Sequence, residues 1–286
     1  MYLDLHTHSY FSDGELSPEE IIDKARNKKT SIFSITDHNF LPDTASIKTY
    51  AEKNQIQYID GVEISTLYRM SGSNFSLHIL GYGRQLNREI LNKNLQRTID
   101  GYNRRAIAII DKINKLLPDL RMDFQSLRLA GHEAYVSRNT IARIVAQHLK
   151  GNITVKDVLR KYVFIEQEDD TWMMTPKESF QLIASAGGIP VLAHSGRELR
   201  KLGHVAYEEI LANLAKEGLL GLEVYYPKHS EDEVITLRNL GRKLGLYITG
   251  GSDWHGVIYT PEVSIGREIP AEDITPFLQD SRISTL

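Results

Sequence analysis

The sequence predicts an α/β protein in which strands and helices alternate around a parallel sheet or barrel, with a mostly helical subdomain inserted between two strands. Three observations carry this prediction. Short apolar runs recur along the chain, helical patterns with clear start signals separate many of them, and residues 84–175 hold mostly helical patterns. With 286 residues, the chain is long enough for one large α/β domain or for a barrel carrying an insertion.

Seven apolar runs are the expected strands, and each run ends in polar or glycine-rich residues. The expected strands span residues 2–5, 31–35, 57–62, 76–81, 189–193, 221–225 and 246–249. Because helical patterns alternate with these runs, the strands are expected to form βα units and a parallel sheet. In barrels of parallel strands, reacting groups gather at the carboxyl ends of the strands.

The helices between the strands have legible start and stop signals. Ser17-Pro18-Glu19-Glu20, Thr175-Pro176-Lys177-Glu178 and Ser230-Glu231-Asp232-Glu233 each fit a capping box, and the first two place proline at the first helical position. The Ala-Gly-Gly of residues 186–188 and the Leu-Gly of residues 244–245 are typical of helix ends. We therefore expect a helix after each of these starts.

Residues 84–175 lie between the fourth and fifth expected strands and include helical patterns at residues 104–117 and 140–149. We interpret them as an inserted subdomain that caps the substrate, and residues 1–83 and 176–286 as the barrel. Residues 84–161 hold 16 lysines and arginines against 7 aspartates and glutamates, a net charge of +9 that leaves −12 for the remainder. Such a basic segment is typical of a surface that attracts anions or of a solvated helical face.

The composition limits the chemistry. The chain has no cysteine, so it has neither disulfides nor thiolate ligands, and any metal is bound through nitrogen and oxygen. No secretory signal pattern begins the chain, and no apolar run approaches the roughly 20 residues of a membrane-spanning helix. We expect a cytoplasmic protein without membrane contact, and no obligate protein partner is inferred.

Two histidines follow the first expected strand in Asp-Leu-His-Thr-His-Ser, residues 4–9. Alternate side chains of a strand point to the same face, so His6 and His8 project together while Thr7 points away. A single His-x-His pair is a weak signal of a metal site. It becomes specific if further ligands stand at the ends of other strands.

Further ligands do follow the other expected strands. Together with Asp13, in the loop after the first strand, they make six histidines and three carboxylates: His6, His8, Asp13, His38, Glu63, His78, His194, Asp253 and His255. Each alone is typical of a partly buried histidine, a helix cap or an ion pair. Their coincidence at strand ends predicts a site for more than one divalent ion, and nitrogen and oxygen ligands suit Mn, Fe or Zn.

Other catalytic signals are weak or missing. Gly250-Gly251-Ser252 lacks the lysine and spacing of a phosphate-binding P-loop and is better explained as room for close backbone approach beside Asp253. No Gly-x-Ser-x-Gly elbow occurs and there is no thiol nucleophile, so the nucleophile is expected to be metal-bound water. His229 follows the sixth strand and is a candidate substrate contact, whereas His132, His148 and His204 are expected to be bystanders.

With these residues assembled, the chain resembles the PHP family, named for polymerase and histidinol phosphatase, over nearly its whole length. The matching motifs are His6-Thr7-His8, Ser12-Asp13-Gly14, Thr36-Asp37-His38, Gly61-Val62-Glu63-Ile64, His78-Ile79-Leu80-Gly81, Ala193-His194-Ser195-Gly196-Arg197 and Gly251-Ser252-Asp253-Trp254-His255. The resemblance implies a distorted seven-stranded (β/α)7 TIM-like barrel with three metal ions.

The resemblance also implies how the ligands are shared. His6, His8, Glu63 and Asp253 would hold the first metal; Glu63 would bridge to a second held by His78 and His194; and Asp13, His38 and His255 would hold the third. Within the family, the chain looks most similar to the stand-alone branch of nucleoside 3',5'-bisphosphate phosphatases and 5'-3' exoribonucleases. Ser12-Asp13-Gly14, Gly61-Val62-Glu63-Ile64-Ser65, Ser185-Ala186-Gly187-Gly188 and Gly221-Leu222-Glu223-Val224-Tyr225-Tyr226 carry that similarity.

Two departures from the branch bear on the substrate. The branch usually reads His-Pro-Gly-Arg after the fifth strand, where this chain has His194-Ser195-Gly196-Arg197 and so keeps the ligand and the arginine. In the insertion the branch often reads Arg-Pro-His, where this chain has Arg138-Asn139-Thr140 and lacks the histidine. The choice of substrate is what these departures put in doubt.

The predicted reaction is hydrolysis of phosphate monoesters of small nucleotides by a metal-bridging hydroxide. A nucleoside 3',5'-bisphosphate is the expected substrate, with AMP and short single-stranded RNA or DNA as further candidates. Arg138 and Arg197 are expected to bind the phosphate. Asp37 and His229 are the candidate general acids for the leaving group.

Three alternatives stay open. The first is a histidinol-phosphate phosphatase, although Asp13 stands where many of those enzymes have histidine. The second is a metal-dependent amidohydrolase, which can also begin with His-x-His; against it stand the pair Asp37-His38 after the second strand, Glu63 after the third, and the presence of only seven strand runs. The third is an accessory barrel with structural metals, which an incomplete ligand set would favour.

Overall fold

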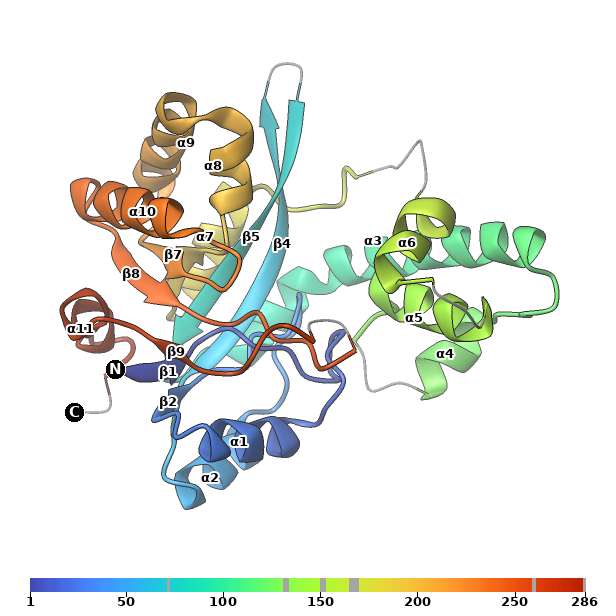
Figure 1. The fold of residues 1–286 in the computed structure, drawn as a ribbon, viewed down its shortest axis with the longest axis horizontal. Helices are drawn as coiled ribbons and strands as arrows, with labels where there is room; N and C mark the ends of the chain where they lie inside the picture. The colour runs from blue at the N-terminus through green and yellow to red at the C-terminus, as the bar shows by residue number, and fades with distance from the viewer. Residues whose placement is uncertain (71–72, 131–133, 150–152, 165–169, 259–260, 285–286) are drawn as a thin grey trace.

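The computed structural model describes residues 1–70, 73–130, 134–149, 153–164, 170–258 and 261–284, and these form two lobes (Figure 1). The larger lobe contains the strands, with helices packed on its outer faces, and the smaller lobe is helical and projects from one side. Within these residues, no helix has the length and apolar character needed to span a membrane. The predicted α/β class is confirmed.

The strands of the described residues form two mixed sheets, nine strands in all. The first sheet has the order β3-β2-β1-β9, in which β1 to β3 are parallel and β9 is antiparallel to β1. Its strands are β3 (Gln57–Tyr58), β2 (Ile32–Phe33), β1 (Tyr2–Asp4) and β9 (Arg267–Glu268). The second has the order β4-β5-β6-β7-β8, with strands β4 (Asp60–Met70), β5 (Ser73–Gly83), β6 (Ile189–Leu192), β7 (Gly221–Tyr225) and β8 (Tyr247–Gly250).

Both edge strands of the second sheet, β8 and β4, are linked to segments that follow inner strands of the first sheet. Beyond the end of β8, the Asp253 N–H donates to the His6 carbonyl at 2.7 Å, which joins the chain after β8 to the chain after β1. At the other edge, the Asn39 N–H donates to the Glu63 carbonyl at 2.8 Å and joins the chain after β2 to β4. The segments that follow β1, β2 and β8 therefore converge beside β4.

The strand pattern corrects the expected count and direction. Six of the seven expected strands match β1, β2, β5, β6, β7 and β8, and the run at residues 57–62 covers β3 and the start of β4. Strand β9 was not expected, and the strands form two mixed sheets instead of one parallel sheet. The run at residues 76–81 lies in β5, which is antiparallel to both β4 and β6. Only residues 71–72 separate β4 from β5, too few for the crossover that a parallel pair requires.

Seven helices of the described residues pack around the larger lobe. They are α1 (Pro18–Asn27), α2 (Ala45–Lys53), α7 (Pro176–Ser185), α8 (Gly196–Leu202), α9 (His204–Glu217), α10 (Glu231–Lys243) and α11 (Ala271–Leu278). The three expected capping boxes are present at Ser17, Thr175 and Ser230, each with its side chain accepting from the N–H three residues on. These caps satisfy helix N–H groups that would otherwise lack partners.

Apolar clusters support the strands from both sides. One cluster joins the second sheet to helices α7, α9 and α10 and includes the fully buried Ile79 and Leu222. Another includes Leu5, Val191 and Phe277, and it packs α11 against the strands. Close packing of this kind holds a strand in place. The polar residues that follow the strands are thus presented from a rigid base.

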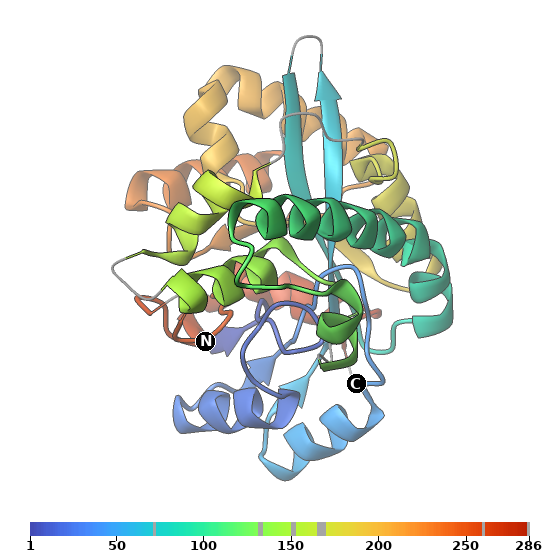
Figure 2. The ribbon, with the colours of Figure 1, turned by 90° about the vertical axis from the view of Figure 1, so that its right-hand side faces the viewer.

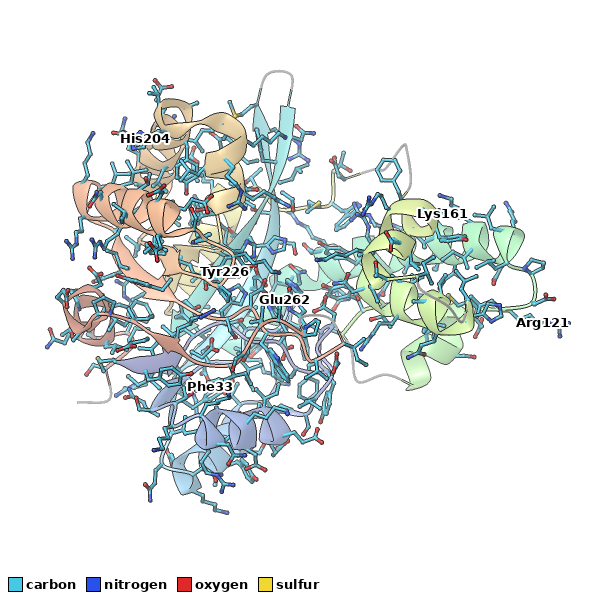
Figure 3. All side chains as sticks on the ribbon, in the orientation of Figure 1. Phe33, Arg121, Lys161, His204, Tyr226 and Glu262 are labelled. Carbon is cyan, nitrogen blue, oxygen red and sulfur yellow. The ribbon has the colours of Figure 1, made fainter. Side chains whose placement is uncertain are left out.

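The helical lobe is formed by α3 (Arg88–Leu116), α4 (Phe124–Ala130), α5 (Arg138–Leu149), α6 (Val155–Val158) and a π-helical turn, η1 (Leu159–Val163). These helices share an apolar cluster of their own, which includes Ile109, Ile141 and Val158. Figure 2 shows the long helix α3 crossing the front of the lobe and continuing back toward the strands. In Figure 3, Arg121 marks the far end of this lobe, and Lys161 lies on its upper side.

Candidate metal centre

The candidate centre begins with the two histidines that follow β1. Thr7 points away from them, because its hydroxyl donates to the Ser34 carbonyl at 3.0 Å. His6 and His8 are buried, and their Nε2 atoms lie 3.2 and 3.1 Å from Oε2 of Glu63. The same two Nε2 atoms lie 3.4 and 3.3 Å from Oδ1 of Asp253. The alternation of a strand thus directs both imidazoles at one point.

Glu63, buried on β4, lies at the middle of the centre. Its Oε2 faces Nδ1 of His38 at 3.1 Å in addition to the two histidines after β1. Its Oε1 faces Nδ1 of His78 at 2.8 Å and Nε2 of His194 at 3.2 Å. One carboxylate therefore contacts imidazoles that follow β1, β2 and β6 or lie on β5.

Asp13 gathers a third group of side chains. Its Oδ1 lies 3.3 Å from Nε2 of His255 and 3.8 Å from Nε2 of His38. The His255 ring stacks on the ring of His8, with centroids 4.0 Å apart. The Asn139 amide, from the first turn of α5, donates to Oδ2 of Asp13 at 2.8 Å.

All nine predicted ligands thus lie together, and three groups of them have ligand atoms within 4.8 Å of one another. The groups are His6, His8, Glu63 and Asp253; His38, Glu63 and His78; and His8, Asp13, His38 and His255. His194 stands outside these groups, although it contacts Glu63. The grouping resembles the expected partition, with His38 and His8 each shared more widely.

The donor atoms fit divalent cations. Six buried atoms of the centre lack a hydrogen-bond partner with acceptable geometry: Nε2 of His6, Nδ1 and Nε2 of His8, Oδ1 of Asp13, Nδ1 of His38 and Oε2 of Glu63. A buried polar atom without a partner costs about 1–3 kcal/mol, so six of them in one cluster suit divalent ions, which would accept their lone pairs. Nitrogen and carboxylate oxygen donors suit Mn, Fe and Zn.

The carboxylates of the centre stay ionised. Burial by itself would raise the pKa of Glu63, but His38, His6 and His78 hold it well below its usual range. For Asp13 burial is likewise outweighed, because His255 and His38 keep its pKa well below the ordinary value. Both groups are therefore available as anionic ligands.

Two ligands occupy unusual backbone conformations. His194 and Asp253 have φ angles of 28° and 54°, in the left-handed region that non-glycine residues rarely adopt. Such strain clusters at functional sites, where the surroundings hold it in place. Next to Asp253, a Cβ at Gly251 would lie 2.5 Å from the His6 backbone nitrogen, so glycine is required there for close approach.

Sequence reasoning missed the role of Glu223. This carboxylate on β7 is fully buried; its Oε1 lies 3.0 Å from Nδ1 of His6, and its Oε2 accepts from the His194 N–H at 2.8 Å. A carboxylate on Nδ1 sets the imidazole so that Nε2 faces the centre. The available signal was an acidic residue inside an apolar strand, Gly221–Tyr225.

Tyr226 was also missed. Its hydroxyl donates to Oδ2 of Asp253 at 3.2 Å, and its ring centroid lies 5.5 Å from that of His194. Burial raises the pKa of Tyr226, and the charges of Asp253 and Glu223 raise it further, so the phenol stays protonated. Figure 3 shows Tyr226 in the middle of the larger lobe, far from His204 on α9.

The two candidate general acids do not face the centre as donors. Asp37 accepts from the Ser9 N–H at 2.9 Å, the Ser9 hydroxyl at 2.6 Å and the Ser12 hydroxyl at 2.6 Å, so it braces the loop that carries Asp13. Position after a strand decides neither the rotamer nor the partners of a side chain. The geometry therefore favours a positioning role for Asp37.

His229 is engaged by the backbone at both ring nitrogens. Nδ1 lies 2.9 Å from the Val224 carbonyl, and Nε2 accepts from the Gly196 N–H at 3.0 Å. A proton on Nδ1 and a lone pair on Nε2 satisfy both contacts, so neither nitrogen is available to a leaving group. Among the other histidines, His148 and His204 are exposed, and His132 lies outside the described residues.

Arg138 and Arg197 line one cavity of about 610 Å³ together with Asp13, His38 and His78. Arg138 begins α5 in the helical lobe, and Arg197 belongs to the first turn of α8. The Arg197 guanidinium lies 2.6 Å from Glu198 and donates to the Ser76 carbonyl at 3.2 Å. Both predicted arginines thus border the cavity that opens onto the centre.

The sequence profile of the PHP domain matches residues 4–243. The chain belongs to the PHP domain family. The matched span contains the PHP motifs from His6 to His194 and the whole helical lobe, and only Asp253 and His255 of the centre follow it. The resemblance drawn from the sequence motifs is confirmed.

Relatives of this PHP domain cover most of its length. The 3',5'-nucleoside bisphosphate phosphatase of Chromobacterium violaceum is 29% identical over 262 residues, 88% of this chain and 87% of the relative. The 5'-3' exoribonuclease Rnm of Escherichia coli is 27% identical over 274 residues, 93% of this chain and 88% of the relative. Both relatives are named as hydrolases of phosphoester bonds. The predicted enzyme class, a hydrolase of that bond, is thereby confirmed for this chain.

A solved structure has the same fold. It comes from Chromobacterium violaceum and is described as an amidohydrolase with bound sulfate and no metal. Its TM-score is 0.78 at 25% identity, over 94% of this chain and 92% of that one. The PHP fold of the present chain, with its two mixed sheets and helical lobe, is therefore shared with an experimentally determined protein.

Proposed function

We propose that the chain is a metal-dependent phosphoesterase that hydrolyses phosphate monoesters of small nucleotides, with nucleoside 3',5'-bisphosphates as the preferred substrate. One observation carries the proposal. The cavity of about 610 Å³ joins the cluster of nitrogen and carboxylate donors to the guanidinium groups of Arg138 and Arg197. Metal ligands beside fixed arginines suit a phosphate group.

Three divalent ions are proposed for the centre, with Mn, Fe and Zn as candidates. His6, His8, Glu63 and Asp253 would hold the first, Glu63, His78 and His194 the second, and Asp13, His38 and His255 the third. When bound, such ions lower the pKa of water and neutralise charge on the phosphate. Glu63 is suited to sharing because its two oxygens face different histidines.

The side chains around the cavity have separate proposed roles. Arg138 and Arg197 bind phosphate oxygens and offset the negative charge that builds up during hydrolysis. Glu223 orients His6, and Asn139 orients Asp13. Asn139 occupies the insertion motif where the branch often has proline, so this chain uses the motif to support a ligand.

We also propose that the chain has two functional parts. Residues 1–83 and 176–286 would form the metal-binding barrel, and residues 84–175 a basic cap over the substrate. Three features support the cap: its separate apolar cluster, its contribution of Arg138 to the cavity, and the net charge of +9 over residues 84–161. The cytoplasmic location stays a prediction.

A second candidate function is removal of nucleotides from short RNA. The name of the Escherichia coli relative favours it, and so does the basic helical lobe, because an oligonucleotide has several phosphates to neutralise. Histidinol phosphate remains a candidate substrate with one phosphate. The description of the Chromobacterium violaceum structure keeps amide hydrolysis as an alternative to be tested.

The test is phosphate release by the Mn-loaded protein from adenosine 3',5'-bisphosphate, AMP and histidinol phosphate, with His8→Ala as the inactive control. We expect the bisphosphate to be preferred and the activity to be lost in the variant. A preference for histidinol phosphate would overturn the nucleotide assignment. Hydrolysis of amides but of no phosphoester would overturn the proposed reaction altogether.

A further inference from the structure

A third arginine, Arg105, lines the same cavity from helix α3. Its guanidinium carbon lies 4.8 Å from the ring centroid of Trp172 and 5.5 Å from that of Tyr102. The two rings meet edge to face at 4.9 Å, and Tyr102 stacks on Tyr135 at 4.7 Å. We name Tyr102, Tyr135 and Trp172 the aromatic shelf. A guanidinium packed on aromatic faces keeps its planar donors in a fixed orientation.

The sequence of α3 is adapted to this shelf. A Cβ at Gly101 would come within 2.5 Å of three ring atoms of Trp172, so only glycine admits the indole at that point of the helix. Glycine in a helix interior costs about 1 kcal/mol relative to alanine. Residues four apart lie on one helix face, so the same contact brings Trp172 beneath Arg105 one turn later.

The shelf is also tied to the metal centre. The Ser65 side chain lies close to the Tyr102 hydroxyl, and Ser65 lies directly opposite His78 in the β4–β5 ladder. The Asn39 amide, next to His38, donates to the Tyr135 hydroxyl at 3.4 Å. The residues that Arg105 packs on therefore contact the larger lobe as well as the helical lobe, and this fixes the position of Arg105 relative to the candidate metal ligands.

We propose that Arg105 is a specificity-determining residue that binds a second phosphoryl group of the substrate while the first lies at the metal centre. The inference rests on the proposed function, since it names the feature of the substrate that this site selects. Arg138 and Arg197 already serve the phosphate that is hydrolysed. A third guanidinium in one cavity matches a further dianion, and its fork can bind two phosphate oxygens at once.

The remaining wall of the cavity is consistent with a nucleoside between the two phosphates. Leu159, Val163 and Phe164 line it at and just after η1, and the Phe164 side chain is exposed. Apolar and aromatic side chains of this kind accept the faces of a base. A substrate with one phosphate would place no second phosphoryl group beside Arg105.

The test compares wild type, Arg105→Met and Arg105→Gln, with Arg104→Met as the matched control. Arg104 is the preceding residue of α3, is exposed and is not among the described residues that line the cavity. Two readouts are required: kcat/KM of the Mn-loaded protein, and Kd of the chelator-treated protein, each for adenosine 3',5'-bisphosphate and for AMP. Melting temperatures establish that each variant is folded.

We expect wild type to favour the bisphosphate over AMP and Arg105→Met to reduce that preference about tenfold to hundredfold, the range for a hydrogen bond to a charged group. Arg104→Met should keep the wild-type preference. Equal losses for both ligands, or an unchanged preference in a folded variant, would overturn the inference. If Arg105→Met melts early, Arg105→Gln decides by the same criterion, because it keeps a planar group on the shelf without the charge.

The two readouts separate this inference from the proposed function. If wild type hydrolyses neither nucleotide but its Kd values show a bisphosphate preference that depends on Arg105, the proposed reaction fails and the second anion site stands. If wild type hydrolyses the bisphosphate and the preference for the bisphosphate over AMP is the same in Arg105→Met, the proposed reaction stands and the inference about Arg105 fails.

Discussion

Glu223 is a buried carboxylate whose two oxygens hold other residues of the centre. One oxygen lies 3.0 Å from Nδ1 of His6 and the other accepts from the N–H of His194. Through these contacts β7 supports residues that follow β1 and β6. A carboxylate behind a ligating histidine sets both the direction and the basicity of the imidazole.

Replacing Glu223 with glutamine should weaken metal binding about tenfold to hundredfold, because the amide cannot hold His6 and His194 as the carboxylate does. Metal affinity by titration calorimetry and metal content after dialysis measure the effect. Glu209→Gln on α9, an exposed site, is the control. A Glu223→Gln variant with wild-type affinity would show that His6 is oriented by something else.

Asp37 is expected to stabilise the fold. Burial raises its pKa, while hydrogen bonds from Ser12 and Ser9 lower it. Asp37→Asn would turn amide hydrogens toward donors and should cost about 1–3 kcal/mol of unfolding free energy, measured by urea denaturation. It should also reduce metal binding through Asp13. Wild-type stability and metal content, combined with loss of activity, would instead support Asp37 as the general acid.

At the scale of elements, two helical glycines make opposite contributions. Gly101 in α3 faces Trp172, and a Cβ there would overlap the ring, whereas a Cβ at Gly241 in α10 would meet its nearest atom, on Ile248, at 3.5 Å. Packing against Trp172 requires glycine at position 101. At position 241 no such contact requires it, and glycine only lowers the intrinsic stability of α10.

We expect Gly101→Ala to destabilise the protein despite the better helix propensity of alanine, because overpacking typically costs about 1–3 kcal/mol. Gly241→Ala should stabilise it by up to about 1 kcal/mol. Denaturant midpoints of the two variants measure the difference. Stabilisation by both substitutions would mean that Trp172 does not pack on α3 as described.

At the scale of the whole molecule, the centre joins parts that are distant in sequence. Its candidate ligands come from segments that follow β1, β2, β6 and β8 and from the antiparallel pair β4 and β5. The cavity above them also receives Arg105 and Arg138 from the helical lobe. Ions bound at this point should therefore stabilise both sheets together.

Removing metal with a chelator should lower the melting temperature, and adding Mn²⁺ should restore it in a saturable way. An ion at one hundred times its Kd adds about 2.7 kcal/mol per site when it binds only the folded state. His8→Ala should respond less, because His8 belongs to two of the ligand groups. A melting temperature that is indifferent to chelator and to Mn²⁺ would count against ions in this centre.

Much of this protein was determined by the sequence itself. Capping boxes at Ser17, Thr175 and Ser230 act over four residues, so the helix starts could be predicted locally. The alternation of His6-Thr7-His8 is equally local. The clustering of the nine candidate ligands could be predicted because strand ends converge in such folds, whichever sheet each strand joins.

Only the tertiary structure decided the direction of β5, the second sheet and the partners of buried polar groups. Asp37 and His229 follow strands as the candidate ligands do, yet their side chains form hydrogen bonds to Ser9, Ser12, Gly196 and Val224, which strand position did not predict. The roles proposed for Glu223 and Arg105 depend on contacts across about 217 and 67 residues of sequence, to His6 and Trp172. Sequence spacing determines on which face of a strand or helix a side chain lies. The partners of that side chain depend on how segments distant in sequence pack together.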